Sequence, residues 1–189
     1  MGEAEALMDR RGQRWIIISF FFLSSILTAT WSSRIPDIQR KLDLSNAALG
    51  TVLFAIPVGL IFSLTVASWL IAFLGAKRVM LFSCIFCAIV LVLAAMASTT
   101  LQLTIILFLL GFVRTLFNLS ANTSAIELQR QYERPIIASF HGIWSMACFI
   151  AAGIGTIMII GNVNAFIHFL LIALVASIVA FALTGKEIS

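Results

Sequence analysis

The sequence VMLFSCIFCAIVLVLAAMASTTLQLTIILFLLGFVRTLFNLSANTSAI runs from Val79 to Ile126 and carries a single formal charge, on Arg114. These 48 residues are too many for one bilayer crossing, which needs about 20 apolar residues in a helix. They fit two crossings joined at the polar residues 98–100. The stretch therefore predicts two transmembrane helices, the second with an arginine in its interior.

Charge-free intervals on both sides of this pair predict further crossings. Residues 15–33 fit one helix, and residues 44–76 fit one long helix with Ser45 as its N-cap and Pro57 as a bend. Residues 135–185 fit two helices that are separated at 161–164. We therefore expect an all-α integral membrane protein with a cytoplasmic tail at 1–14, a six-helix bundle at 15–185 and a cytoplasmic end at 186–189. The expected spans are about 15–35, 46–74, 78–97, 101–126, 136–160 and 164–184.

The composition excludes a water-soluble fold. Hydrophobic residues make up 61% of the chain, charged residues 11%, and the mean hydropathy is +1.10. The net charge of +4 does not indicate a nucleic-acid partner, because the basic residues form short clusters between apolar runs. Cys84, Cys87 and Cys148 lie within apolar runs, so we expect them to pack and to form neither a disulfide nor a metal site. No cofactor is implied.

The basic residues also predict the orientation of the chain in the membrane. Six crossings place eight Lys and Arg residues on one side and three on the other, and cytoplasmic loops are the more basic. We therefore expect both termini in the cytoplasm. The larger set is Arg10, Arg11, Arg14, Lys77, Arg78, Arg130, Arg134 and Lys186, and the smaller is Arg34, Arg40 and Lys41.

A short similarity within the chain indicates an internal repeat. Residues 38–40 (Ile-Gln-Arg) follow the first span, and residues 128–130 (Leu-Gln-Arg) follow the fourth. Inverted repeats of three helices build the halves of several transporters. The similarity therefore favours a three-plus-three organisation.

The polar residues of the fourth span lie on one helix face. Arg114, Asn118 and Asn122 recur at intervals of four. An arginine near the middle of a membrane helix costs about 3 kcal/mol unless it meets water, carbonyl oxygens or an anion. We expect Arg114 to border an aqueous cavity and to bind a solute with the two asparagines. The alternative is that it joins helices through backbone carbonyls or reaches the cytoplasmic interface.

Other polar side chains are weaker candidates for a pathway. Ser24, Thr28 and Ser32 share a face of the first span, where hydroxyls either line a pathway or bond to their own helix. His141 and Ser145 share a face of the fifth span, and His141 is a candidate for proton coupling. His168 is expected to be satisfied by packing or by the interface.

Several motifs together resemble the N-terminal six-helix half of a major facilitator superfamily transporter, in the bacterial subgroup related to sugar permeases such as the fucose permease. They are residues 31–37 (WSSRIPD), 44–50 (LSNAALG) leading to Pro57 and Gly59, 75–78 (GAKR), Arg114, and 139–145 (SFHGIWS). The resemblance implies gating or coupling roles for His141, Ser145, Gly75, Lys77, Arg78 and Arg34. Ala72 and Phe73 depart from the family pattern, which has a carboxylate before the glycine of this loop.

The resemblance implies secondary active transport of a small sugar-like solute or organic anion across the inner membrane of a bacterium. A second six-helix half would complete the cavity, either as a separate chain, as a missing C-terminal half or as a second copy. The alternatives are a nontransporting subunit or inactive remnant and, more remotely, an intramembrane serine protease that uses His141 with Ser139 or Ser145. We expect no enzyme activity, because the chain has no glycine-flanked serine motif.

Overall fold

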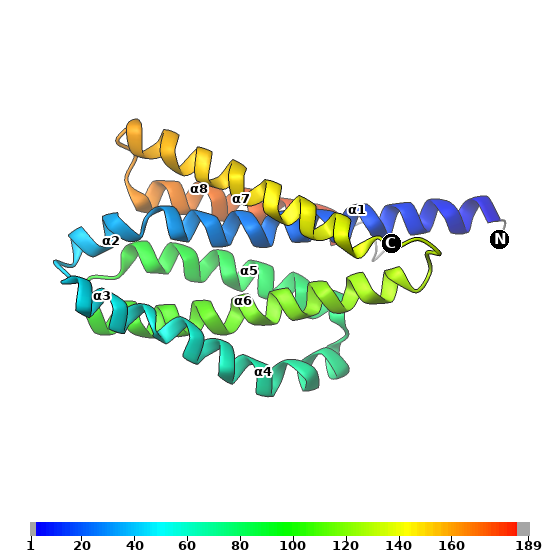
Figure 1. Ribbon diagram of the computed structural model, residues 1–189, viewed down its shortest axis with the longest axis horizontal. Helices are drawn as coiled ribbons and strands as arrows, with labels where there is room; N and C mark the ends of the chain where they lie inside the picture. The colour runs from blue at the N-terminus through cyan, green and yellow to red at the C-terminus, as the bar shows by residue number, and fades with distance from the viewer. Residues whose placement is uncertain (1–2, 185–189) are drawn as a thin grey trace.

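The computed structural model describes residues 3–184, all of whose regular structure is α-helical. The expected all-α membrane fold is confirmed: six of its helices are long and apolar enough to cross a bilayer. Figure 1 shows them as a bundle of roughly antiparallel rods. The helices are α1 (Glu3–Ser33), α2 (Ile35–Lys41), α3 (Asn46–Leu53), α4 (Ala55–Leu74), α5 (Ala76–Met96), α6 (Thr100–Gln129), α7 (Ile137–Ile160) and α8 (Ala165–Thr184).

Polar residues define where two of these helices begin. The Ser45 hydroxyl accepts a hydrogen bond from the Ala48 N–H, as the sequence predicts, and the Thr99 hydroxyl accepts one from the Gln102 N–H. Each bond satisfies a backbone donor that would otherwise lack a partner in the first helical turn. Local sequence therefore sets the start of α3 and the start of α6, and these two starts lie at the same end of the bundle.

The second span is interrupted, where the sequence predicts one long helix. Its first turns form α3 and the remainder forms α4, with a turn at Phe54 between them. Pro57 follows three residues later and has no N–H to donate to the carbonyl of Leu53. The predicted bend is therefore present, and it lies on the N-terminal side of the proline.

The first helix begins before the expected first span, and the cytoplasmic placement of the tail stays a prediction. The expected tail at 1–14 is helical from Glu3, because α1 is continuous through Arg10 and Arg14 into the apolar stretch. The first span ends at Ser33, and α2 follows after a turn at Arg34. The expected end at 186–189 lies outside the described residues.

The long helices pack in two layers. α7, α1, α6 and α4 follow one another across the face seen in Figure 1, while α5 and α8 pack against each other behind them. The helix contacts repeat between the first three spans and the last three. The first span, α1, packs on α7 as the fourth, α6, packs on α4, and α5 contacts α6 as α8 contacts α1. Exchanging the first three spans with the last three reproduces these pairs, as a three-plus-three repeat requires.

Two glycines bring α4 and α6 into backbone contact. A Cβ atom on Gly59 would fall on the carbonyl oxygen of Phe108, and one on Gly111 would fall on that of Ile56. Small residues allow such close approach, which is a main source of helix association in a membrane. The glycines therefore fix α4 against the part of α6 that carries Arg114.

Candidate functional site

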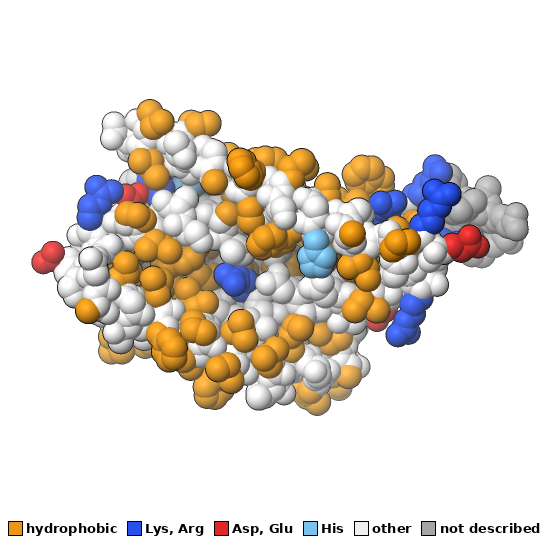
Figure 2. Space-filling view, viewed as in Figure 1, with side chains coloured by type: hydrophobic (Ala, Val, Ile, Leu, Met, Phe, Trp, Pro, Cys, Tyr) orange, Lys and Arg blue, Asp and Glu red, His pale blue; other side chains and the backbone are white. Residues whose placement is uncertain are grey.

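Arg114 lies in the interior of α6 and is half-buried. Among the residues that the structure describes, no hydrogen bond or ion pair holds its guanidinium. Figure 2 shows basic surface at mid-length of the face formed by α7, α1, α6 and α4, far from the basic groups at either end. The guanidinium therefore keeps its donors for a group that this bundle does not supply.

The two asparagines of the same face are partly engaged within the bundle. The Ser24 hydroxyl donates to Asn118 Oδ1 at 2.7 Å, joining α1 to α6. Asn122 Nδ2 donates to the Asn118 carbonyl at 2.7 Å. Both asparagines are half-buried. Ser24 and Asn118 thus meet at the contact between the first and fourth spans, and Arg114 lies one helical turn before Asn118 in α6.

The remaining hydroxyls of α1 bond to their own helix. Thr28 Oγ1 donates to the Ser24 carbonyl at 2.8 Å, and Ser32 Oγ donates to the Thr28 carbonyl at 3.2 Å. Ser24 is buried, Thr28 half-buried and Ser32 exposed. These three residues therefore lead along α1 from the buried α6 contact to the surface, and their oxygens can still accept hydrogen bonds from a solute.

His141 and Ser145 lie on the exposed side of α7. The His141 ring meets Phe21 of α1 edge-on, with 5.5 Å between ring centroids. Histidine surface is visible in Figure 2 on the same face as the central basic patch. The His141 side chain is therefore exposed on α7 beside α1.

Arg34 is buried in a polar cluster at the opposite end of α1. Its Nη1 donates to Asp37 Oδ2 at 2.7 Å, its Nη2 to the Val163 carbonyl at 2.9 Å and its Nε to His168 Nδ1 at 3.2 Å. The expectation that packing satisfies His168 was incomplete, because the buried ring also accepts this hydrogen bond. Arg34 therefore ties the end of α1 to the start of α8.

The charge of Asp37 balances this cluster. Partial burial alone would raise the pKa of its carboxyl, but hydrogen bonds from Arg34 and Arg40 and their positive charge lower the pKa below its ordinary value of 3.8. Asp37 is thus ionised at neutral pH and pairs with both arginines.

The short loop between α4 and α5 consists of Gly75, followed by Lys77 and Arg78 in the first turn of α5. Gly75 has φ +83°, and a Cβ there would meet open space, so its backbone conformation is what requires glycine. Lys77 and Arg78 are both exposed. The loop thus combines a glycine-dependent turn with two cations at the surface.

The structure also shows groupings that sequence reasoning missed. It brings Ser24 to Asn118, Arg34 to His168, and the arginines at the start of α1 to Arg134 in the α6–α7 loop. Each grouping joins two parts of the chain that are at least 94 residues apart. The sequence shows that each of these residues is polar or basic, but no pattern in it indicates which of them meet in the fold.

Comparison with known proteins finds relatives that are named as transporters. The chain is 30% identical to an uncharacterized transporter of Sinorhizobium fredii over 81% of its own length and 41% of the relative's. It is 24% identical to an uncharacterized MFS-type transporter of Yersinia pestis, over 70% of its length and 35% of the relative's. Both of these relatives are named as transporters, and the second is named as an MFS-type transporter.

A third relative is the membrane protein MosC of Rhizobium meliloti, which is 28% identical over 75% of the chain and 34% of the relative. The chain thus spans less than half the length of each of these relatives. No family model and no solved structure matches it. Together with the six apolar helices, the relationship identifies a multi-pass membrane protein.

Proposed function

We propose that the chain forms one six-helix half of a major facilitator carrier, which moves a small solute across the inner membrane of a bacterium by secondary active transport. Both termini lie in the cytoplasm in this proposal, because that end of the bundle carries most of the basic residues. The relatives named as transporters support the general role. The solute, the mechanism and the orientation are inferences from the residues.

The observation that carries the proposal is the guanidinium of Arg114, which makes no hydrogen bond or ion pair with the described residues. A charge at this depth needs water or an anion to offset a cost of about 3 kcal/mol. An aqueous route along the α1–α6 face supplies the water, and a passing solute with a carboxylate or several hydroxyls supplies acceptors. Asn118, Asn122, Ser24, Thr28 and Ser32 line the same route in this proposal.

A second six-helix bundle completes the wall of that route. α4 and α7 flank the Arg114 face, and only 22% and 17% of the residues in the most apolar part of their spans are buried, compared with 56% for α5 and 28% for α8. The exposed apolar side chains of α4 include Phe62 and Trp69, and those of α7 include Phe149. The matched relatives extend well beyond the part that this chain covers. The second bundle is a further part of the same protein, a separate chain or a second copy.

Within the carrier, the bacterial sugar-permease-like subgroup is the proposed affiliation. A guanidinium flanked by two carboxamides offers donors to sugar hydroxyls and to a carboxylate alike. His141 and Ser145 serve coupling or gating in this proposal, together with Arg34 and the Gly75, Lys77 and Arg78 loop.

Cysteine labelling tests the aqueous route. In a variant without the three native cysteines, Arg114→Cys is compared with Phe86→Cys, which lies at mid-length of α5 in the rear layer and is exposed there. Each is treated in native membranes with a membrane-impermeant maleimide from either side, because thiolates form and react in water. We expect position 114 to be labelled and position 86 to remain unlabelled.

The opposite outcome is decisive. A cysteine at 114 that is sealed from aqueous reagents on both sides would refute the pathway.

The solute class is tested separately by thermal unfolding of the purified protein with sugars and small organic anions, since a ligand that binds the folded state raises its stability. Arg114→Gln should abolish any such shift, and an unchanged shift would remove Arg114 from the solute site.

A further inference from the structure

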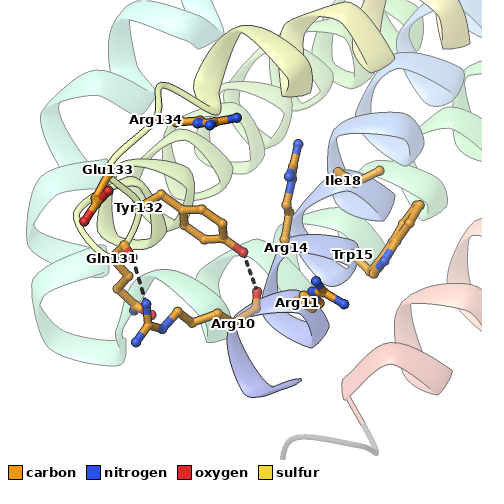
Figure 3. Close-up of a pocket in the computed structure, with 9 residues that line it drawn as sticks. All are labelled: Arg10, Arg11, Arg14, Trp15, Ile18, Gln131, Tyr132, Glu133 and Arg134. Atoms are coloured by element: carbon orange, nitrogen blue, oxygen red, sulfur yellow. Dashed lines mark hydrogen bonds between the residues drawn. The ribbon is translucent and has the colours of Figure 1, made fainter. Parts of the chain in front are cut away.

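An arginine-rich cleft of about 740 Å³ lies between the start of α1 and the α6–α7 loop. Arg10, Arg11 and Arg14 line it from α1, and Tyr132 and Arg134 line it from the loop (Figure 3). The cleft lies at one end of the bundle, remote from the mid-span position of Arg114. It therefore calls for an explanation other than the proposed solute route.

Hydrogen bonds hold the two walls of the cleft together. Arg10 Nη1 donates to the Gln131 carbonyl at 3.2 Å, and the Tyr132 hydroxyl donates to the Arg10 carbonyl at 3.2 Å. Arg14 Nη2 donates to Ser139 Oγ at 3.3 Å, which adds a link to α7. The start of α1 and the loop thus form a preorganised cleft, which lowers the entropy cost of binding a ligand.

The positive charge of this cleft is not balanced by the side chains described around it. Four arginines face one carboxylate, that of Glu133, which is exposed and points away from Arg14 and Arg134 in Figure 3. The Nε of Arg14 is buried and has no hydrogen-bond partner within the described structure. A buried donor without an acceptor is costly, so the cleft favours an anion that presents several oxygens.

The position of the cleft indicates where that anion comes from. Trp15 lines the cleft with an indole that is 68% exposed, and the apolar part of α1 begins at this residue, with Ile18 also in the lining. Tryptophan at the end of a membrane span is typical of the headgroup level of a bilayer. A ligand bound here would have its charged group among the arginines and its apolar part beside Trp15 and Ile18.

We propose that this cleft binds the phosphate of an anionic lipid headgroup from the adjacent leaflet. Arginine forks bind phosphate oxygens in bidentate fashion, and basic pockets between membrane helices bind anionic headgroups. The bound lipid joins α1 to the α6–α7 loop and so stabilises the contact between the first and fifth spans.

Native mass spectrometry of the purified full chain tests the proposal by titration with phosphatidylglycerol and with phosphatidylcholine. The informative variant is Arg134→Gln, because Arg134 is exposed and its loss leaves the helix packing intact. The matched control is Arg130→Gln, which removes the same charge from an exposed position four residues away, outside the cleft. Inorganic phosphate is added as a competitor in a separate arm.

We expect phosphatidylglycerol to bind more tightly than phosphatidylcholine, and Arg134→Gln to weaken its binding about fivefold while Arg130→Gln leaves it unchanged. Millimolar inorganic phosphate should not displace the lipid. Equal binding of the two lipids, or equal weakening by the two variants, would overturn the proposal. Displacement by inorganic phosphate at the affinity of the lipid would assign the cleft to a soluble phosphate and overturn the lipid assignment.

Discussion

Replacing Gly111 by alanine should separate α4 from α6. The added methyl group would fall on the carbonyl oxygen of Ile56, a backbone atom that cannot rotate away as a side chain can. On the partner helix, Gly59 makes the reciprocal contact with the carbonyl of Phe108. The two helices must therefore move apart along a contact that lies one turn from Arg114.

The magnitude follows from two opposing effects. Forcing extra volume into a packed contact costs about 1–3 kcal/mol, and a rigid backbone obstacle favours the upper part of that range. Alanine has a better helix propensity than glycine by about 1 kcal/mol, which offsets part of the cost. We expect a net loss of about 2 kcal/mol, which corresponds to a Tm lower by about 4–8 °C for a chain of this size.

Gly153→Ala in α7 is the matched control, because a Cβ there meets nothing within 4 Å. Without a clash only the propensity gain remains, so its Tm should stay level or rise by about 2–4 °C. Both variants are compared with the unmodified chain by thermal unfolding in the same detergent. A Gly111→Ala variant as stable as the unmodified chain, or equal destabilisation by both substitutions, would refute the reasoning.

Two further predictions concern polar contacts between and beyond the spans. Ser24→Ala removes the donor to Asn118 and should lower the free energy of unfolding by about 0.6 kcal/mol, and at most by about 1.7 kcal/mol. Ser32→Ala should have no effect in the same unfolding assay. Equal losses in the two variants would contradict a stabilising role for the Ser24–Asn118 hydrogen bond. The lowered pKa of Asp37 contributes stability that is present above pH 3.8 and is lost as the pH falls through the folded-state pKa. Thus Asp37→Asn should lower the Tm at pH 6, and the loss should shrink as the pH falls below 3.8. An effect that is independent of pH would contradict the pairing.

The sequence determines the helices of this protein to a large extent. Lipid cannot satisfy backbone N–H and C=O groups, so each apolar stretch must satisfy its own, and a helix does so with local hydrogen bonds. The six spans, the Ser45 cap and the interruption near Pro57 therefore follow from neighbouring residues. The common face of Arg114, Asn118 and Asn122 follows from the period of the helix.

Only the tertiary structure decides which helix faces meet. Ser24 finds Asn118, Arg34 finds His168, and Gly59 and Gly111 meet opposite backbone carbonyls. These pairings depend on close contact between helices far apart in the chain, and an apolar helix surface is compatible with lipid and with many apolar neighbours. Hydropathy thus defines the spans, whereas the fit of small residues and the need to satisfy buried polar groups select the neighbours.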